Sequence, residues 1–349
     1  MNSEKKFFHS NTAIVTLFAA CFVVLISLGV RQTFGLFFID FNESLNISNT
    51  AFGFAIGTQM LMWGLTGPIF GAIADRFGGH VAIISSFLFY TLGVYFLYSG
   101  PNTGIFFQIH LGLLIGIGLG GTAISIPMSI VGKHFPLSNR TIAMSIVTAV
   151  GSFGYFISPI FTNYSLIEYG WNYTLFLFSL FLVTGLIAAF FVRSPKENEI
   201  VENRSDQSFK EALSEAFKSK SYILLVSGFF VCGFHITLVG THVPKYVIDR
   251  GLEDWTAAAI LSLIGLFNIF GSLLSGYLST KISKKVLLSA IYLLRGFSIA
   301  FFIFTPPSVL SAFIFGASFG FLWLSTVPAT SGIVAHLFGT KYLGLLYGI

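Results

Sequence analysis

Charged side chains are scarce in this chain of 349 residues. Asp, Glu, Lys and Arg together make up 9% of it, against roughly 25% in soluble globular domains. No charged residue occurs from 50 to 74 or from 77 to 132, and a helix of about 20 apolar residues already crosses a bilayer. Hydrophobic residues make up 54% of the chain, and the mean hydropathy is +0.83. The composition excludes a soluble protein and predicts an integral membrane protein that crosses the bilayer many times.

The chain also lacks the residue clusters that chemistry within a membrane requires. Its two cysteines, Cys21 and Cys232, both stand inside apolar segments, which excludes a disulfide framework or a cysteine metal site. No H-E-x-x-H motif or pair of intramembrane aspartates occurs, and no acidic residue falls inside a predicted span away from its ends. The net charge of +5 belongs to no soluble domain large enough to bind nucleic acid. We therefore expect no enzyme, metal, cofactor or nucleic-acid partner.

Ten apolar segments are each long enough to cross the bilayer as a helix. A polar segment at 193–220 separates the first six from the last four. Within it Phe209, Leu213 and Phe217 recur on one helical face, which predicts a short amphipathic helix on the membrane surface. We expect an all-α fold with an N-terminal bundle at 1–192, a linker at 193–220 and a C-terminal bundle at 221–349. The predicted spans are 13–38, 50–74, 81–99, 105–131, 141–164, 172–192, 221–243, 255–280, 286–304 and 308–338.

Basic residues gather at one end of these spans. Cytoplasmic loops of membrane proteins carry the excess of Lys and Arg, so the N-terminus and the linker are predicted to lie in the cytoplasm, with the protein in the plasma (inner) membrane. The opposite end has only Lys245 and Arg250, beside several acidic residues. The bases outside the linker at the predicted cytoplasmic end are Lys5, Lys6, Arg76, Lys133, Arg140, Lys281, Lys284, Lys285 and Lys341.

A charge pair stands on a glycine turn between two of the longest apolar runs. The stretch reads G-x-x-x-D-R-x-G, with Gly71, Asp75, Arg76 and Gly78 at its defined positions. It resembles the loop between helices 2 and 3 of major facilitator superfamily transporters. The resemblance implies two six-helix bundles with a solute site between them near the middle of the membrane, and alternating access by rocking of the bundles.

The second half of the chain carries a degenerate copy of this stretch. At an offset of 205 residues, Gly71 aligns with Gly276, whereas Asp75 aligns with Thr280. In the superfamily this Asp helps to hold the bundles together against the positive N-terminal end of helix 11, which here would begin near Lys341. The apolar run 342–349 is too short to cross a bilayer. We therefore expect a fragment with about ten full spans and the start of helix 11.

A narrower resemblance involves helices 1 and 5. The segment 27–33 is similar to the S-Y-x-x-x-K-S motif of monocarboxylate transporters, with Arg31 in the basic position. The resemblance implies that Arg31 binds a carboxylate, which a guanidinium can grip through two parallel hydrogen bonds. The helix-5 signature of that family is matched by Arg140, Ala143, Ala149, Gly151, Ser152 and Gly154.

Helix 8 departs from that pattern. Many monocarboxylate transporters have an Asp and an Arg there, where this chain has Asn268 and Ser272. Asn268 is a candidate hydrogen-bonding residue for the substrate. His235 on helix 7, seven residues before His242, is a candidate substrate-binding residue and also a candidate proton carrier, because histidine titrates near neutral pH. Two roles of Arg295 remain open: it binds a structural partner within the protein, or it contacts the substrate.

The function predicted is secondary active transport of a small solute, a monocarboxylate or other organic anion. The implied partners are that solute, the bilayer and either a coupled proton or a counter-substrate. Two alternatives stay open: a permease or efflux protein of the same superfamily for a different small molecule, and a transport-inactive sensor. The drug–proton antiporter motif R-x-x-Q-G of helix 4 is not matched, because the corresponding segment 112–116 reads Gly-Leu-Leu-Ile-Gly.

Overall fold

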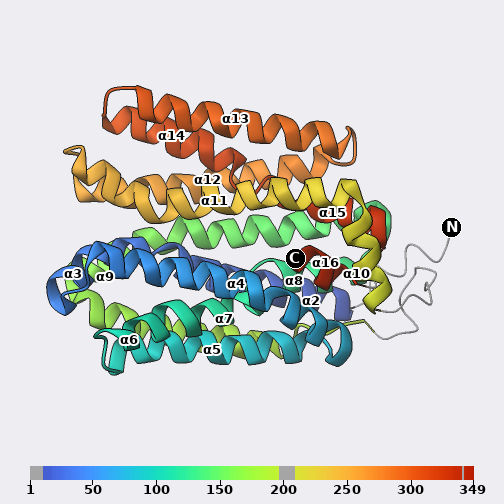
Figure 1. Cartoon of the computed structure of the whole chain (residues 1–349), viewed down its shortest axis with the longest axis horizontal. Coiled ribbons are helices and arrows are strands. Elements are labelled where there is room, and N and C mark those ends of the chain that lie inside the picture. Colours follow the sequence, from blue (N-terminus) through green and yellow to red (C-terminus); the bar gives the residue numbers. More distant parts are fainter. Residues whose placement is uncertain (1–10, 196–208, 340–341) are drawn as a thin grey trace.

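The computed structural model describes residues 11–195, 209–339 and 342–349. Its long helices lie side by side along one axis, and no strand occurs in the described ranges (Figure 1). Eight helical stretches in them are long and apolar enough to cross a membrane. The helix over residues 49–77 is not among these eight, because Gly, Thr and Gln interrupt its apolar residues, yet it runs alongside the others. The predicted all-helical membrane fold is confirmed.

The N-terminal bundle contains the six predicted spans in order. The first breaks at Thr33, where α-helix gives way to a 3-10 turn. The fourth contains a π-helical segment and a second break at residues 123–124. The elements are α2 (Asn11–Gln32), η1 (Phe34–Phe37), α3 (Phe38–Leu45), α4 (Asn49–Phe77), α5 (Gly79–Ser99), α6 (Ile105–Phe107), η2 (Gln108–Leu114), α7 (Ile115–Thr122), α8 (Ser125–His134) and α9 (Leu137–Ala189).

The element α9 covers two predicted spans and folds back on itself at Gly170. The backbone of Gly170 has φ +79°, a conformation that glycine adopts without steric cost. Across this reversal the hydroxyls of Ser165 and Thr174 are hydrogen-bonded at 2.8 Å, and the ring of Phe161 contacts that of Phe178. α9 is therefore a hairpin of two antiparallel spans joined without a loop.

The C-terminal set has a break inside one predicted span, four residues before Pro328. The predicted span 308–338 divides into two helices, with residues 323–325 between them. A short helix precedes this set and lies across the ends of the longer ones (Figure 1). The elements are α10 (Phe209–Lys218), α11 (Lys220–Asp249), α12 (Asp254–Leu278), α13 (Lys284–Phe304), α14 (Val309–Leu322), α15 (Thr326–Phe338) and α16 (Leu343–Gly348).

The predicted amphipathic helix of the linker corresponds to α10. Its Ala212 and Ala216 are buried, and Leu213 packs against the core. Phe217 is half exposed and meets the ring of Tyr222 edge-on. α10 thus packs one face against the helix ends.

Glycines allow the two bundles to approach closely. A Cβ added to Gly265 of α12 would lie 2.2 Å from the backbone nitrogen of Phe156 in α9, and one added to Gly276 would lie 2.3 Å from the hydroxyl of Ser145. Helices in lipid associate through such small residues, because no hydrophobic driving force acts between them there. The first half of α9 is therefore the main contact between the bundles.

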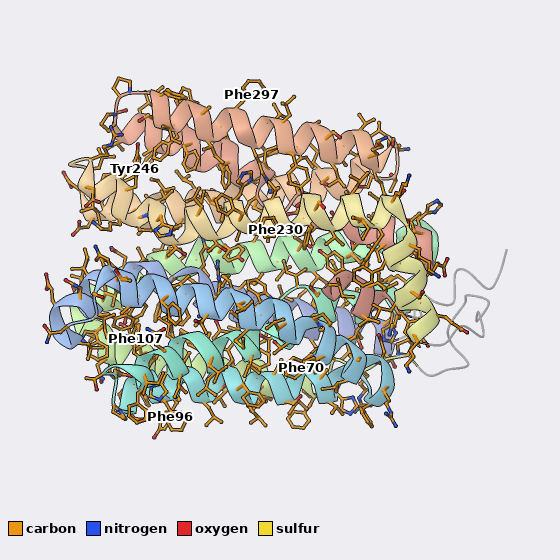
Figure 2. The ribbon with its side chains drawn as sticks, viewed as in Figure 1. Phe70, Phe96, Phe107, Phe230, Tyr246 and Phe297 are labelled. Atoms are coloured by element: carbon orange, nitrogen blue, oxygen red, sulfur yellow. The ribbon has the colours of Figure 1, made fainter. Side chains whose placement is uncertain are left out.

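Large apolar side chains cover the outer faces of the molecule. Phe230 of α11 and Phe297 of α13 are 75% and 64% exposed, whereas Phe107 is fully buried (Figure 2). A surface of this kind is expected where lipid tails replace water.

Candidate functional site

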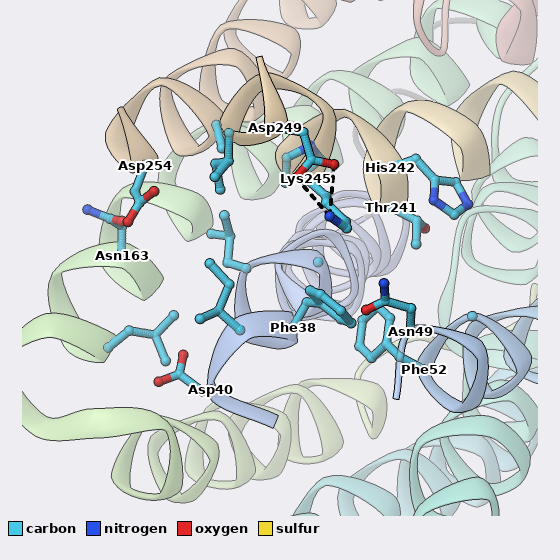
Figure 3. A pocket seen from close by; sticks show the side chains of 18 of the residues that line it. Phe38, Asp40, Asn49, Phe52, Asn163, Thr241, His242, Lys245, Asp249 and Asp254 are labelled. Atoms are coloured by element: carbon cyan, nitrogen blue, oxygen red, sulfur yellow. Dashed lines mark hydrogen bonds and ion pairs between the residues drawn. The ribbon is translucent and has the colours of Figure 1, made fainter. Parts of the chain in front are cut away.

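A cavity of about 680 Å³ lies between the bundles at the end opposite α10. Its walls come from η1, α3, α4 and the α9 hairpin on one side, and from α11 and α12 on the other. Lys245 and Asp249 form an ion pair at 2.8 Å on its wall (Figure 3). The polar residues that line it are Asp40, Asn49, Asn163, Thr241, His242, Lys245, Asp249 and Asp254.

The bundles touch beneath this cavity at two glycines. A Cβ added to Gly35, which lines the cavity, would lie 2.9 Å from the carbonyl oxygen of Gly240 in α11. No side chain fits between two backbones at that separation. This contact closes the space between η1 and α11.

Arg31 lies four residues before Gly35, at the end of α2, and its side chain is buried. Its Nη2 is 3.2 Å from the sulfur of Met60, and its guanidinium carbon is 5.8 Å from the centre of the Trp63 ring. Among the described residues no carboxylate lies within ion-pair distance of it. With one hydrogen bond, to a thioether sulfur, the guanidinium has most of its hydrogen-bonding capacity unused among the described residues.

Gln32, which the sequence interpretation overlooked, is buried next to Arg31. Neither its amide nitrogen nor its amide oxygen has a hydrogen-bond partner within the described chain. The signal was present, since a second polar side chain follows Arg31 directly after a long apolar run.

Asn268, a predicted site residue on α12, is fully buried in a hydrogen-bond network. Its Nδ2 donates to the hydroxyl of Ser152 on α9 at 2.6 Å. Its Oδ1 accepts from the backbone N–H of Leu324 at 2.8 Å and from Ser272 at 3.3 Å. Asn268 therefore links the two bundles and satisfies a backbone group at the break between α14 and α15.

Arg295 of α13 occupies the other side of that break. Its Nε donates to the carbonyl oxygen of Leu322 at 2.9 Å, and its Nη2 donates to the same oxygen and to that of Trp323. Its Nη1 lies 3.1 Å from the sulfur of Cys232. These carbonyls have lost their helical partners, and an unpaired carbonyl at bilayer depth is costly. Of the two roles left open for Arg295, its contacts favour the structural one.

The ring of Trp323, inside the break, meets Tyr155 of α9 edge-on, with ring centres 6.2 Å apart. Both side chains are fully buried. Tyr155 also lies near enough to Arg31 for an electrostatic interaction. Tyr155 thus interacts electrostatically with Arg31 of α2 and packs against the break in the C-terminal bundle.

The two histidines of α11 lie in different surroundings. His242 lines the cavity and projects beside Thr241 (Figure 3). His235 is half-buried, close enough to Arg295 for their charges to interact, and its Nδ1 has no hydrogen-bond partner among the described residues. Within the described chain, no hydrogen bond joins Arg31, His235 or Asn268 to one another.

At the end near α10, the charged motif forms a partly buried ion pair. Asp75 Oδ1 accepts a hydrogen bond from Nζ of Lys133, at the end of α8, at 2.5 Å. The backbone N–H of Leu345 in α16 also interacts with this carboxylate, although Oδ2 has no partner within ordinary hydrogen-bond geometry. The predicted approach of helix 11 to Asp75 thus has a counterpart in α16.

The other motif residues shape the turn between α4 and α5. Gly78 has φ +97°, which favours glycine, and its N–H donates to the carbonyl of Ala74. Gly71 is buried, and Arg76 is exposed, with its guanidinium 5.1 Å from the centre of the Phe77 ring. Lys341, the remaining member of the predicted set, lies outside the described residues.

The family model and the related proteins that match this chain point to the same family. Residues 20–349 match the family model of the Major Facilitator Superfamily. The chain is 23% identical to the MFS-type transporter YcxA of Bacillus subtilis (strain 168), covering 95% of this chain and 83% of that protein. It is 25% identical to monocarboxylate transporter 6 of Mus musculus, covering 81% of this chain and 65% of the mouse protein.

A solved structure shows the same fold. The fucose:proton symporter FucP of E. coli superposes with a TM-score of 0.71 at 14% identity, over 97% of this chain and 88% of the symporter. With the helical architecture and the family match, this shows that the chain is a multi-pass integral membrane protein that belongs to the Major Facilitator Superfamily, a transporter of small solutes and not an enzyme.

Proposed function

We propose that this protein transports a small organic anion, a monocarboxylate or a related carboxylate, and that Arg31 binds the carboxylate group. The observation that carries the proposal is the buried guanidinium of Arg31, which has no carboxylate partner within the described chain and lies close to the contact between the bundles. Placing an Arg at bilayer depth costs about 2.5–3.5 kcal/mol on insertion scales. A substrate carboxylate would offset that cost, and monocarboxylate transporter 6 of Mus musculus is a relative.

In this proposal the substrate reaches Arg31 by alternating access. The cavity lies at the end where the topology prediction places the outside. Gly35, which packs against Gly240, lines it, whereas Arg31 does not. Separation of η1 from α11 would join the cavity to Arg31. At the cytoplasmic end Asp75, Lys133 and α16 would have to separate for release. A proton or a counter-substrate would drive the cycle, with His235 as the proposed proton carrier.

Orientation and location belong to the same proposal. The N-terminus and the end with α10 would face the cytoplasm, in the plasma (inner) membrane, because cytoplasmic ends carry the excess of basic residues. A single cysteine introduced at Lys284 should then be protected from a membrane-impermeant thiol reagent in intact cells, whereas one at Glu253 should react. If only the cysteine introduced at Lys284 reacts, the orientation is the opposite of the one proposed.

The decisive experiment is uptake of labelled short carboxylates into proteoliposomes. Wild-type protein should take up at least one of them, and Arg31→Gln should abolish uptake while Arg31→Lys retains part of it. Arg250→Gln is the matched control, because Arg250 is exposed at the end of α11 and stacks on Tyr246. Normal uptake by Arg31→Gln would refute the assigned role. If the wild type moves no carboxylate, the anion proposal fails and a different solute has to be sought.

A further inference from the structure

The amide of Gln32 is a buried hydrogen-bonding group without a protein partner. The residue is 1% exposed, and both its Nε2 and its Oε1 are orphaned within the described chain. Buried polar groups in native proteins are nearly always paired, because an unpaired one forfeits the bonds it makes in water. Ordinary packing therefore does not explain a glutamine at this position, and a ligand that completes its hydrogen bonds does.

Gln32 and Arg31 converge on one point of the opposite bundle. A Cβ added to Gly240 would lie 3.5 Å from Oε1 of Gln32, 3.9 Å from Nε2 of the same residue and 3.6 Å from Nη1 of Arg31. Consecutive helical residues ordinarily diverge by about 100° around the axis. Here α2 ends at Gln32, and both side chains reach Gly240, a residue with no side chain of its own.

The two groups have complementary chemistry. A guanidinium only donates and matches a carboxylate, whereas a glutamine amide offers one acceptor oxygen and two N–H donors. A ligand that satisfies both has a carboxylate and, a few atoms away, a second polar group that can donate or accept. An unsubstituted aliphatic carboxylate would satisfy Arg31 and leave the Gln32 amide unpaired.

We propose that Gln32 is a specificity-determining residue that binds a second hydrogen-bonding substituent of the substrate whose carboxylate Arg31 holds. The preferred substrates are then carboxylates that carry a hydroxyl, oxo or second carboxyl group close to the first. This inference rests on the proposed function, because it takes Arg31 as the carboxylate site. A site that hydrogen-bonds a substituent strongly rejects an analogue without that substituent. An apolar pocket rejects an analogue with an added hydroxyl much less strongly.

The test is competition for uptake by the full chain in proteoliposomes. Unlabelled butyrate, 2-hydroxybutyrate, 3-hydroxybutyrate and succinate compete with whichever labelled carboxylate the wild type transports. Wild type should bind at least one substituted acid about tenfold or more tightly than butyrate, and Gln32→Leu should remove most of that preference while leaving butyrate within about twofold. Gln32→Met, which also lacks the amide, should behave in the same way and replaces the leucine variant if that fails to fold.

The matched control is Gln59→Leu. Gln59 is also buried, but its Nε2 donates to the carbonyl of Leu111 at 3.0 Å. Gln59→Leu should weaken the binding of all four acids by the same factor, because it disturbs the packing of the helices and not a contact with one substrate group. The inference is overturned if the wild type does not discriminate between butyrate and any substituted acid, or if Gln32→Leu weakens all four alike or none. In those cases the proposed function is still supported if uptake depends on Arg31. A wild type that transports no carboxylate overturns both.

Discussion

Gly35 and Gly240 pack backbone against backbone where the two halves of the chain meet. A Cβ on Gly35 would lie 2.9 Å from the carbonyl oxygen of Gly240. The two glycines are also separated by 205 residues, the offset that aligns the first half of the sequence with the second. Equivalent positions of an internal repeat that touch each other lie close to the axis that relates the repeats. η1 and α11 therefore meet close to that axis, beside the cavity that Gly35 lines.

Replacing Gly35 with alanine should disfavour this conformation. The added methyl would meet a backbone atom, which cannot rotate away, and overpacking of this kind costs about 1–3 kcal/mol. We expect uptake to fall about tenfold and a cysteine introduced at Asn49, on the cavity wall, to react faster with a polar thiol reagent. Gly53→Ala is the control, because Gly53 lines the same cavity and an added Cβ there meets nothing within 4 Å. Equal effects of the two substitutions would contradict the explanation.

Removing the charge of Asp75 should impair transport without abolishing folding. Asp75→Asn leaves the ammonium of Lys133, only about a tenth exposed, without its counter-charge, at an expected cost of about 2 kcal/mol. Transport assays should show a reduced rate, with the protein still monodisperse in detergent. Because the two residues act as a pair, Asp75→Asn with Lys133→Gln should be no worse than the more damaging single change. Wild-type rates in Asp75→Asn, or additive losses, would argue against this role.

Loss of Arg295 should destabilise the fold and leave substrate affinity nearly unchanged. Arg295→Leu frees the carbonyls of Leu322 and Trp323 at the break between α14 and α15, and each unpaired buried group costs about 1–3 kcal/mol. Thermal unfolding in detergent should therefore occur several degrees lower, with partial recovery in Arg295→Lys. KM should stay within about twofold, since a lost carbonyl cap does not alter ground-state binding. A large rise in KM with unchanged stability would instead favour the substrate role.

Substitutions of Asn268 should distinguish its structural role in the hydrogen-bond network from its predicted role in binding substrate. Asn268→Leu leaves the backbone N–H of Leu324 and the hydroxyl of Ser152 without their present partner. We expect lower thermal stability and a lower maximal rate, because the interaction between α9 and α12 weakens. Ser152→Ala removes only one of these bonds and should have a smaller effect. If Asn268→Leu raises KM and leaves stability intact, the substrate contact becomes the better account.

The long uncharged runs of the sequence determined much of this fold. They predicted membrane helices, most of whose ends lie within a few residues of the observed ones, because crossing a bilayer demands a minimum apolar length. The turn at Gly78 was also foreseeable, because glycine adopts the positive φ found there without steric cost. Arg31 was recognisable because an isolated charge beside an apolar run has few explanations.

Only tertiary structure decided which polar groups meet. The backbone groups at the break between α14 and α15 are satisfied by Arg295 and Asn268, which are distant in sequence. The partner of Asp75 is Lys133, 58 residues away, and no periodic pattern encodes that pairing. That the amide of Gln32 is buried, unpaired among the described residues and beside Gly240 follows only from the packing of the helices. Span formation is local, because each helix satisfies its own backbone, whereas side chains find partners only after the helices pack.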